Sequence, residues 1–322
     1  MRRREFLLAL GALSVPTGNG PRCQTRTRLA RVGALRTNTR DREIFAGPFR
    51  KHMTALGWEE QRNISYTFRW AEGRIERLPA LAQELVAEGV DLIVVTGNPG
   101  IKAAQDVTAT IPVVGMSDDL VEGGLAVSMS RPGGNTTGVS IFATELDAKR
   151  LEVLHECVPQ ARHIGILVDP TTTSSARQLD RAARDLSLEL RRFAAKDPLE
   201  IERALDAVVE PPTGAVNVLA SPVLNGAQST IVRRLNEARL PSIYQWPETA
   251  VAGGLLGYGP RLVTCYSHLA GLVNKVLRGS RPSELPIEQP TKFELVINQQ
   301  TAKALGLTIP PTLLARADEV IE

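Results

Sequence analysis

The stretch Asp91-Leu-Ile-Val-Val-Thr96, followed at once by Gly97-Asn98-Pro99-Gly100, decides the fold class of this chain. A short β-branched apolar run that ends at a Gly/Asn/Pro turn is typical of a buried strand. The residues after the turn keep helical spacing up to about Asp106. An apolar strand that leads directly into a helix predicts a parallel sheet covered by helices on both faces.

The same alternation of strand and helix continues on both sides of this stretch. In the first part of the chain, we expect strands at residues 29–35, 64–69, 91–96 and 111–116. The loop Gly133–Gly138 interrupts the rhythm, and a second set of strands follows at residues 163–168, 189–193, 215–220 and 242–245. Such alternation implies βαβ units. Two consecutive sets predict an α/β protein with two doubly wound parallel-sheet lobes joined by a hinge.

The boundaries of the two lobes follow from where each set begins. Residues 29–141 form the predicted first lobe and residues 142–245 the second. The remaining chain is too short for a third lobe. We therefore expect residues of about 246–288 to complete the first lobe and residues of about 289–322 to complete the second. The expected hinge consists of crossovers near Ser140, Gln245 and Pro290.

The first 28 residues have features of an export signal. Arg3-Arg4-Glu5-Phe6-Leu7 places two arginines before an apolar run that ends at Val15 and is too short to span a bilayer. The arginine pair resembles a twin-arginine signal, so the expected location is the periplasm. A small-x-small cleavage site is absent, which leaves a basic cytoplasmic N-terminus as the alternative. Lipidation of Cys23 is disfavoured because Gly20-Pro21-Arg22 precedes it.

The charge and hydropathy of the body exclude two kinds of partner. The formal charge of the chain is +3, but residues 1–28 contain six Arg and one Glu, a local charge of +5, so the body carries −2. A nearly neutral body without a basic face gives no basis for nucleic-acid binding. No later segment has 18 consecutive apolar residues, so we expect a body without a membrane-spanning helix.

The sequence also lacks signals of catalysis, a metal or a cofactor. Its three Cys and four His are scattered without metal-ligand spacing, and Cys157 and Cys265 are interpreted as buried thiols. The sequence has no GxGxxG after the first strand, no GxSxG and no HExxH. We therefore expect no catalytic residue, no metal and no cofactor.

Ligands of open parallel sheets bind beyond the carboxyl ends of the strands. Here the loops at those ends are 36–38, 96–100, 117–119, 169–174, 221–225 and 244–247. The turn at Gly97–Gly100 would present free N–H groups to a carboxylate, although an ordinary capped turn explains it equally well. The hydroxyls of Thr171, Thr172 and Ser174 either contact ligand or cap a helix. Tyr244, close to two other aromatic residues, either stacks on a ligand or packs between the lobes.

Several segments together resemble one known family. They are the Arg-Arg-x-Phe-Leu leader, Val95–Pro99, Ser130–Gly138, Gly253–Pro260, Gln289–Asn298 and Thr301–Leu307. The chain resembles, nearly end to end, the ABC-transporter substrate-binding proteins described as tryptophan/tyrosine-type. This resemblance implies a type I periplasmic-binding fold and an ABC permease and ATPase as partners. It further implies ligand contacts at Thr37, Asn98, Pro99, Gly100, Asp118, Thr171 and Ser221, where Asn98 and Gly100 depart from the Thr-Pro-Ala that relatives usually show.

The function predicted from the sequence is that of an exported, monomeric solute-binding protein of an ABC importer. A small molecule, such as an aromatic amino acid or a related carboxylate, would be held between the lobes and passed to the permease. A ligand-sensing domain of a signalling system is the main alternative, and a Rossmann-like enzyme is a weaker one.

Overall fold

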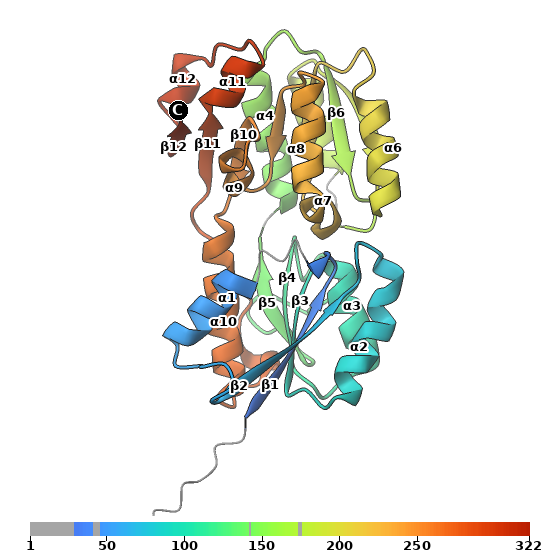
Figure 1. Cartoon of the computed structure of the whole chain (residues 1–322), viewed down its shortest axis with the longest axis vertical. Coiled ribbons are helices and arrows are strands. Elements are labelled where there is room, and N and C mark those ends of the chain that lie inside the picture. The colour runs from blue at the N-terminus through green and yellow to red at the C-terminus, as the bar shows by residue number, and fades with distance from the viewer. Residues whose placement is uncertain (1–28, 41–45, 142, 173–175) are drawn as a thin grey trace, which may run out of the picture.

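The computed structural model describes residues 29–40, 46–141, 143–172 and 176–322, and it places two α/β lobes end to end (Figure 1). The predicted leader at residues 1–28 and the candidate ligand residue Ser174 lie outside the described residues. Each lobe is built around its own sheet. The predicted fold class, two parallel-sheet lobes of the α/β type, is confirmed.

The first lobe contains a five-stranded parallel sheet with the order β2-β1-β3-β4-β5. Its strands are β1 (Ala30–Arg36), β2 (Ile64–Trp70), β3 (Leu92–Thr96), β4 (Val113–Ser117) and β5 (Thr136–Ser140). All residues of β3 are buried, as the apolar run at its centre predicts. The predicted strands of this lobe agree with the observed ones to within two residues.

Helices cover both faces of this sheet, and one of them comes from the far end of the chain. On one face α1 (Ala46–Ala55) packs against α10 (Leu262–Leu277), and their apolar residues share one cluster with β1 and β3. On the other face α2 (Leu78–Ala87) packs against α3 (Asn98–Val107). The first lobe is therefore complete only after the chain has passed through the second.

The second lobe contains a seven-stranded sheet with the order β12-β11-β10-β9-β8-β6-β7. Its strands are β6 (His163–Val168), β7 (Glu189–Ala194), β8 (Ala215–Val218), β9 (Ser242–Tyr244), β10 (Leu256–Gly259), β11 (Glu294–Asn298) and β12 (Glu319–Ile321). The strands β10 and β11 are antiparallel, and every other pair is parallel.

Two apolar clusters cover the faces of this larger sheet. The helices on one side are α4 (Ala143–Cys157), α5 (Ala176–Asp185), α11 (Gln299–Ala304) and α12 (Pro311–Leu314). Those on the other side are α6 (Pro198–Val208), α7 (Pro222–Gly226) and α8 (Gln228–Glu237). The short helix α9 (Pro247–Val251) connects β9 to β10.

The chain crosses between the lobes after β5, after β10 and again before β11. The crossing expected near Gln245 lies instead after Gly259, because β9 and β10 both belong to the larger sheet. Within the range 246–288, α10 and the residues after it belong to the first lobe, whereas α9 and β10 belong to the second. Before the last crossing, Glu288 pairs with the edge strand β5, through Ser140 N to Glu288 O at 3.0 Å.

Strand β5 is a feature that the sequence pattern missed. Its residues Thr136-Thr-Gly-Val-Ser140 contain a single large apolar side chain, so part of the segment was expected as a loop. A Cβ at Gly138 would lie 1.9 Å from Gly115 O on the neighbouring strand, so this close approach of two backbones requires glycine.

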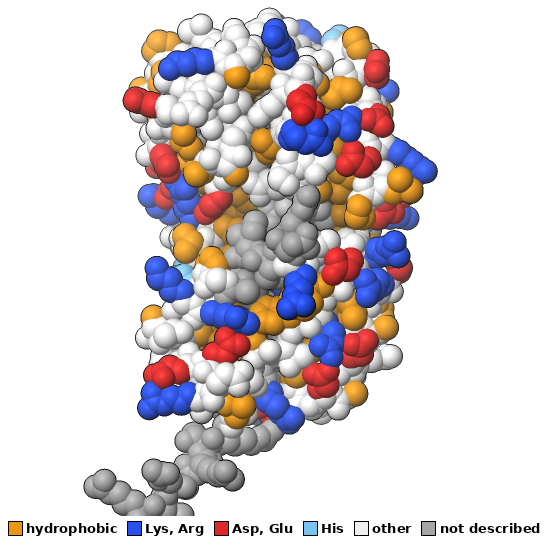
Figure 2. Space-filling view, in the orientation of Figure 1, with side chains coloured by type: hydrophobic (Ala, Val, Ile, Leu, Met, Phe, Trp, Pro, Cys, Tyr) orange, Lys and Arg blue, Asp and Glu red, His pale blue; other side chains and the backbone are white. Residues whose placement is uncertain are grey.

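The surface and the thiols agree with the expectations from composition. In the view of Figure 2, Lys and Arg are interspersed with Asp and Glu, without a broad basic area. Cys157 and Cys265 are buried free thiols. Of the helices in the described ranges, none has the length and apolar character needed to cross a membrane.

Candidate ligand-binding site

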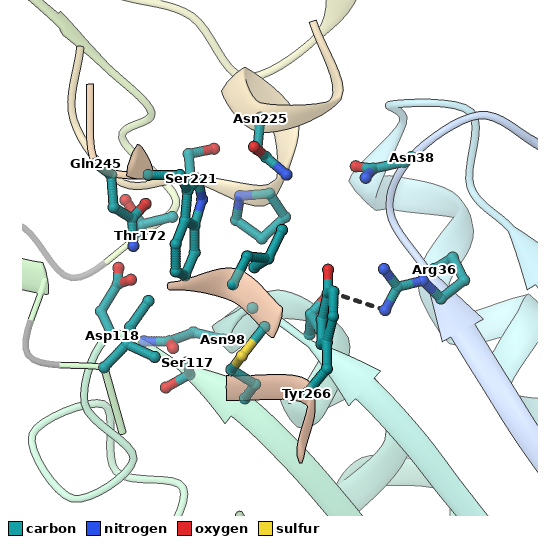
Figure 3. Close-up of a pocket in the computed structure, with 17 residues that line it drawn as sticks. Arg36, Asn38, Asn98, Ser117, Asp118, Thr172, Ser221, Asn225, Gln245 and Tyr266 are labelled. Atoms are coloured by element: carbon teal, nitrogen blue, oxygen red, sulfur yellow. Dashed lines mark hydrogen bonds between the residues drawn. The ribbon is translucent and has the colours of Figure 1, made fainter. Parts of the chain in front are cut away.

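A cavity lies between the lobes, where the carboxyl ends of the strands of both sheets face each other (Figure 3). Its volume is about 520 Å³, including the space that opens to solvent. The first lobe and α10 contribute Arg36, Asn38, Thr96, Gly97, Asn98, Met116, Ser117, Asp118, Ile141, Leu262 and Tyr266. The second lobe contributes Thr172, Ser221, Pro222, Asn225, Gln245 and Trp246. A position between two lobes with a mixed polar and apolar lining is typical of sites for small organic solutes.

The floor of the cavity is formed by the ends of β1, β3 and β4. Arg36 is the last residue of β1, and its Nη1 donates to Thr96 Oγ1 at the end of β3, at 3.3 Å. Helix α3 begins at Asn98, so the positive end of its dipole lies beside the cavity. Gly97 N donates to Met116 O at 2.8 Å and holds the turn against β4.

The roof of the cavity is organised by the buried carboxylate of Asp169, after β6. Its Oδ1 accepts from Thr171 N at 2.9 Å and from Thr171 Oγ1 at 2.7 Å, and its Oδ2 accepts from Ser221 Oγ at 2.6 Å. Ser221 Oγ in turn accepts from Val223 N and Leu224 N as the N-cap of α7. The loops after β6 and β8 are thereby fixed to each other, which positions Thr172 and Ser221 at the cavity.

An apolar wall runs through the cavity from one lobe to the other. Trp246, after β9, belongs to the same buried cluster as Met116 and Ile141 of the first lobe. On α10, Leu262 and Tyr266 are four residues apart and therefore lie on one helix face, which lines the cavity. These side chains offer a flat, mostly apolar surface to a ring.

Two buried charges of opposite sign line the cavity. Arg36 is 3% exposed and Asp118 is 7% exposed, and they are the only formally charged residues among the described lining residues. Figure 3 shows their side chains on opposite sides of the cavity. Buried charges strongly favour groups of complementary charge. A solute that carries both a carboxylate and an ammonium group would match this arrangement of charges.

Four of the candidate ligand residues line the cavity, namely Asn98, Asp118, Thr172 and Ser221. Five others do not: Thr37, Pro99, Gly100, Thr171 and Tyr244. Thr37 accepts from Gly73 N through its carbonyl at 2.7 Å, and Thr171 is bonded to Asp169. A Cβ at Gly100 would meet a Val95 methyl at 2.6 Å, so this glycine packs on β3.

Tyr244 faces away from the cavity into the larger lobe. It is buried, and its hydroxyl lies 2.9 Å from Ser242 Oγ. Burial raises the pKa of Tyr244 well above its ordinary value. The aromatic cluster in the sequence suggested that Tyr244 lines the cavity. In the structure, Trp246 lines it instead.

The sequence pattern did not single out Arg36, Asn225 or Tyr266. Along β1, Arg36 lies on the same face of the sheet as Val32 and Ala34. A charged residue on this otherwise apolar face was the one feature of the sequence that could have indicated a functional role. Tyr266 belongs to a helix whose return to the first lobe is set by tertiary contacts, so its place at the cavity could not be seen from spacing alone.

Glu248 of α9 connects the second lobe to α10 at the crossing beside the cavity. Its Oε1 accepts from Leu262 N at 2.9 Å, in the first turn of α10. Burial raises the pKa of this carboxyl, although the amide hydrogen bonds and the nearby Arg261 oppose the change. The carboxylate thus caps the helix that carries Leu262 and Tyr266 into the cavity.

We expect the Glu248→Gln variant to gain stability relative to the wild type as the pH rises from about 4 to 7. The raised pKa means that the folded wild type binds a proton more tightly than the unfolded chain, whose Glu has a pKa of about 4.3. The stability that the wild type gains from this tighter proton binding is fully present below the pKa of Glu248 in the unfolded chain. It is lost as the pH rises through the pKa of Glu248 in the folded protein. Melting temperatures of both proteins across this range test it, and a constant difference between them would contradict it.

Comparison with known proteins identifies the class to which this fold and cavity belong. Residues 41–321 match the family model described as ABC transporter substrate binding protein. The chain therefore belongs to the ABC transporter substrate-binding protein family. A curated relative, the tyrosine-binding protein of Clostridioides difficile (strain R20291), is 26% identical over 266 residues, which cover 80% of this chain and 75% of the relative.

Solved structures show the same fold. The ABC domain from Streptococcus pneumonia in complex with L-Trp is 22% identical, with a TM-score of 0.81 over 91% of this chain and 100% of that one. A conserved domain protein from Vibrio cholerae is 23% identical, with a TM-score of 0.83 over the same shares. A ligand-free, open substrate-binding protein with adhesive properties from Clostridium difficile is 20% identical over 91% of this chain and 99% of that one, with a lower TM-score of 0.61.

Proposed function

We propose that this protein is the extracytoplasmic receptor of an ABC importer and that it binds an α-amino acid with an aromatic or large apolar side chain. The observation that carries the proposal is the pair of buried opposite charges, Arg36 and Asp118, on two sides of an interlobe cavity. The permease and ATPase as partners, and the periplasm as location, are inferred from the family and from the leader.

The two buried charges would bind opposite ends of the solute. The guanidinium of Arg36 presents a planar pair of donors that matches a carboxylate, and the N–H groups at the start of α3 add to the positive potential of the floor. The carboxylate of Asp118 would accept from the ammonium group. An α-amino acid is the smallest common solute that carries both groups at a fixed separation.

The side chain of the solute would lie along the apolar wall. Trp246 and Tyr266 can pack against an indole or phenol ring, with Leu262 and Met116 filling the remaining surface. The printed names of two relatives, a tyrosine-binding protein and a complex with L-Trp, support the same class of solute.

The direct test is a binding panel on the purified protein. We expect L-Trp, L-Tyr or L-Phe to raise the melting temperature, because a ligand at 100 times its Kd stabilises the folded state by about 2.7 kcal/mol. Glycine, sugars and purines serve as controls that lack the ring, the zwitterion or both. A shift with sugars or purines and none with any amino acid would reject the amino-acid assignment.

A further inference from the structure

Three glycines lie where the two lobes touch, each against a side chain of the opposite lobe. We call the three contacts the glycine seam: Gly73 with Pro198, Gly97 with Pro222, and Gly226 with Asn38. An added Cβ would lie 2.8 Å from Pro198 Cγ, 2.5 Å from Pro222 Cγ and 2.8 Å from Asn38 Oδ1, respectively. At each of these separations something must shift: the Pro198 and Pro222 rings are stiff, whereas the Asn38 amide is the end of a flexible side chain and can turn away.

Gly226 differs from the other two glycines in its backbone. Gly73 and Gly97 have positive φ angles of 74° and 82°, so their own conformations already favour glycine. Gly226 is the last residue of α7 and is not among the residues with positive φ. Its backbone gives no reason for glycine, and the tight contact that the structure shows at this residue is with Asn38.

The contact of Gly226 with Asn38 closes one side of the ligand cavity. Asn38 lines the ligand cavity and also a second interlobe cavity, which Gly73, Pro198 and Gly226 line as well. Close by, Ile75 of the first lobe packs against the apolar clusters of both lobes. The glycine seam therefore consists of contacts that form only when the two lobes touch.

We propose that Gly226 stabilises the closed, ligand-holding state: by leaving room for the Asn38 side chain between the lobes, it raises the affinity for solute. This inference rests on the proposed function, in which the solute is held between closed lobes. An added Cβ would displace the Asn38 side chain from this contact between the lobes. Its cost is therefore expected in the ligand-holding state.

The first experiment compares Gly226→Ala with the matched control Gly271→Ala, using L-tryptophan as the probe. Gly271 lies within α10, and an added Cβ there has nothing within 4 Å. We expect Gly226→Ala to raise the Kd about threefold, less than typical overpacking would, because the Asn38 amide is flexible and can turn away. Its melting temperature without ligand should stay the same or rise, because Ala favours the helix. Gly271→Ala should keep the wild-type Kd.

Two results of this comparison would overturn the proposal. An unchanged Kd for Gly226→Ala would show that closure tolerates the added methyl group. A loss of affinity together with a lower melting temperature in the absence of ligand would assign Gly226 an ordinary structural role instead.

The second experiment tests the contact without relying on any solute. The Asn38 Cβ lies 3.7 Å from the ideal Cβ position of Gly226, a separation that suits a disulfide. The full chain with Asn38→Cys, Gly226→Cys and Cys23→Ser should therefore cross-link under mild oxidation, since Cys157 and Cys265 are buried. L-Tryptophan should accelerate this reaction.

The outcomes of the second experiment separate the two proposals. Absence of the cross-link, with both introduced thiols still free, would overturn the seam. A cross-link that forms at a rate independent of L-tryptophan, in a protein that does not bind it, would support the seam and reject the amino-acid assignment.

Discussion

Replacing Arg36 with Met should weaken the binding of L-tryptophan at least about thirtyfold and leave the binding of tryptamine unchanged. Removing one partner of a buried charge pair typically costs about 2–5 kcal/mol. Tryptamine lacks the carboxylate that Arg36 is proposed to hold, so it loses nothing when the guanidinium is removed. Isothermal titration of L-tryptophan and tryptamine into the wild type and the Arg36→Met variant gives four binding free energies. Their double difference measures the coupling between the ligand carboxylate and the Arg36 side chain.

The complementary variant makes this prediction specific. Asp118→Asn should weaken L-tryptophan binding but leave indole-3-propionate, which lacks the ammonium group, largely unaffected. Arg36→Lys keeps the charge but loses the planar pair of donors, so it should retain part of the affinity. Equal losses for L-tryptophan and tryptamine in Arg36→Met would contradict the assigned role and point to a general disturbance of the cavity, where Arg36 also bonds to Thr96.

The fold could be predicted from sequence because its strands are local and strongly patterned. The run Leu92–Thr96 is buried throughout, and β6 carries a similar apolar run before a turn. The pattern failed where backbone contacts replace side-chain burial, as in β5, whose Gly138 packs directly on Gly115. It also misplaced one crossing, because the short strand β10 gives no sign of which sheet it joins.

The candidate site was predicted only at the level of loops. The carboxyl ends of the strands do face one cavity, and Asn98, Asp118, Thr172 and Ser221 are on its surface. Which residue of a loop points inward depends on register and on helix orientation, and these are tertiary properties. Trp246 rather than Tyr244 therefore lines the cavity, since Tyr244 is buried within the larger lobe.

A buried ion pair lies at the base of the hinge, outside the cavity. In α4, directly after the first crossing, Arg150 donates to the Asp147 carboxylate, and both side chains are almost completely buried. Arg150 Nη1 also donates to Tyr258 O at 3.2 Å, just before the second crossing. Asn217 Nδ2 of β8 donates to Asp147 O at 3.4 Å. Arg150 therefore connects the helix that follows the first crossing to the strand that precedes the second.

The Asp147→Ala variant should lose about 3–5 kcal/mol of unfolding free energy, because it leaves a fully buried guanidinium without its carboxylate. That is a large share of the roughly 5–15 kcal/mol that stabilises a typical protein. Denaturant unfolding followed by circular dichroism measures the loss. The matched control is Glu152→Ala on the same helix, where the Lys149–Glu152 pair is 45% and 47% exposed and should contribute less than about 1 kcal/mol. Similar small losses in both variants would mean that Arg150 is sufficiently stabilised by the Tyr258 carbonyl and its other neighbours, and that the pair orients the crossings without holding the lobe together.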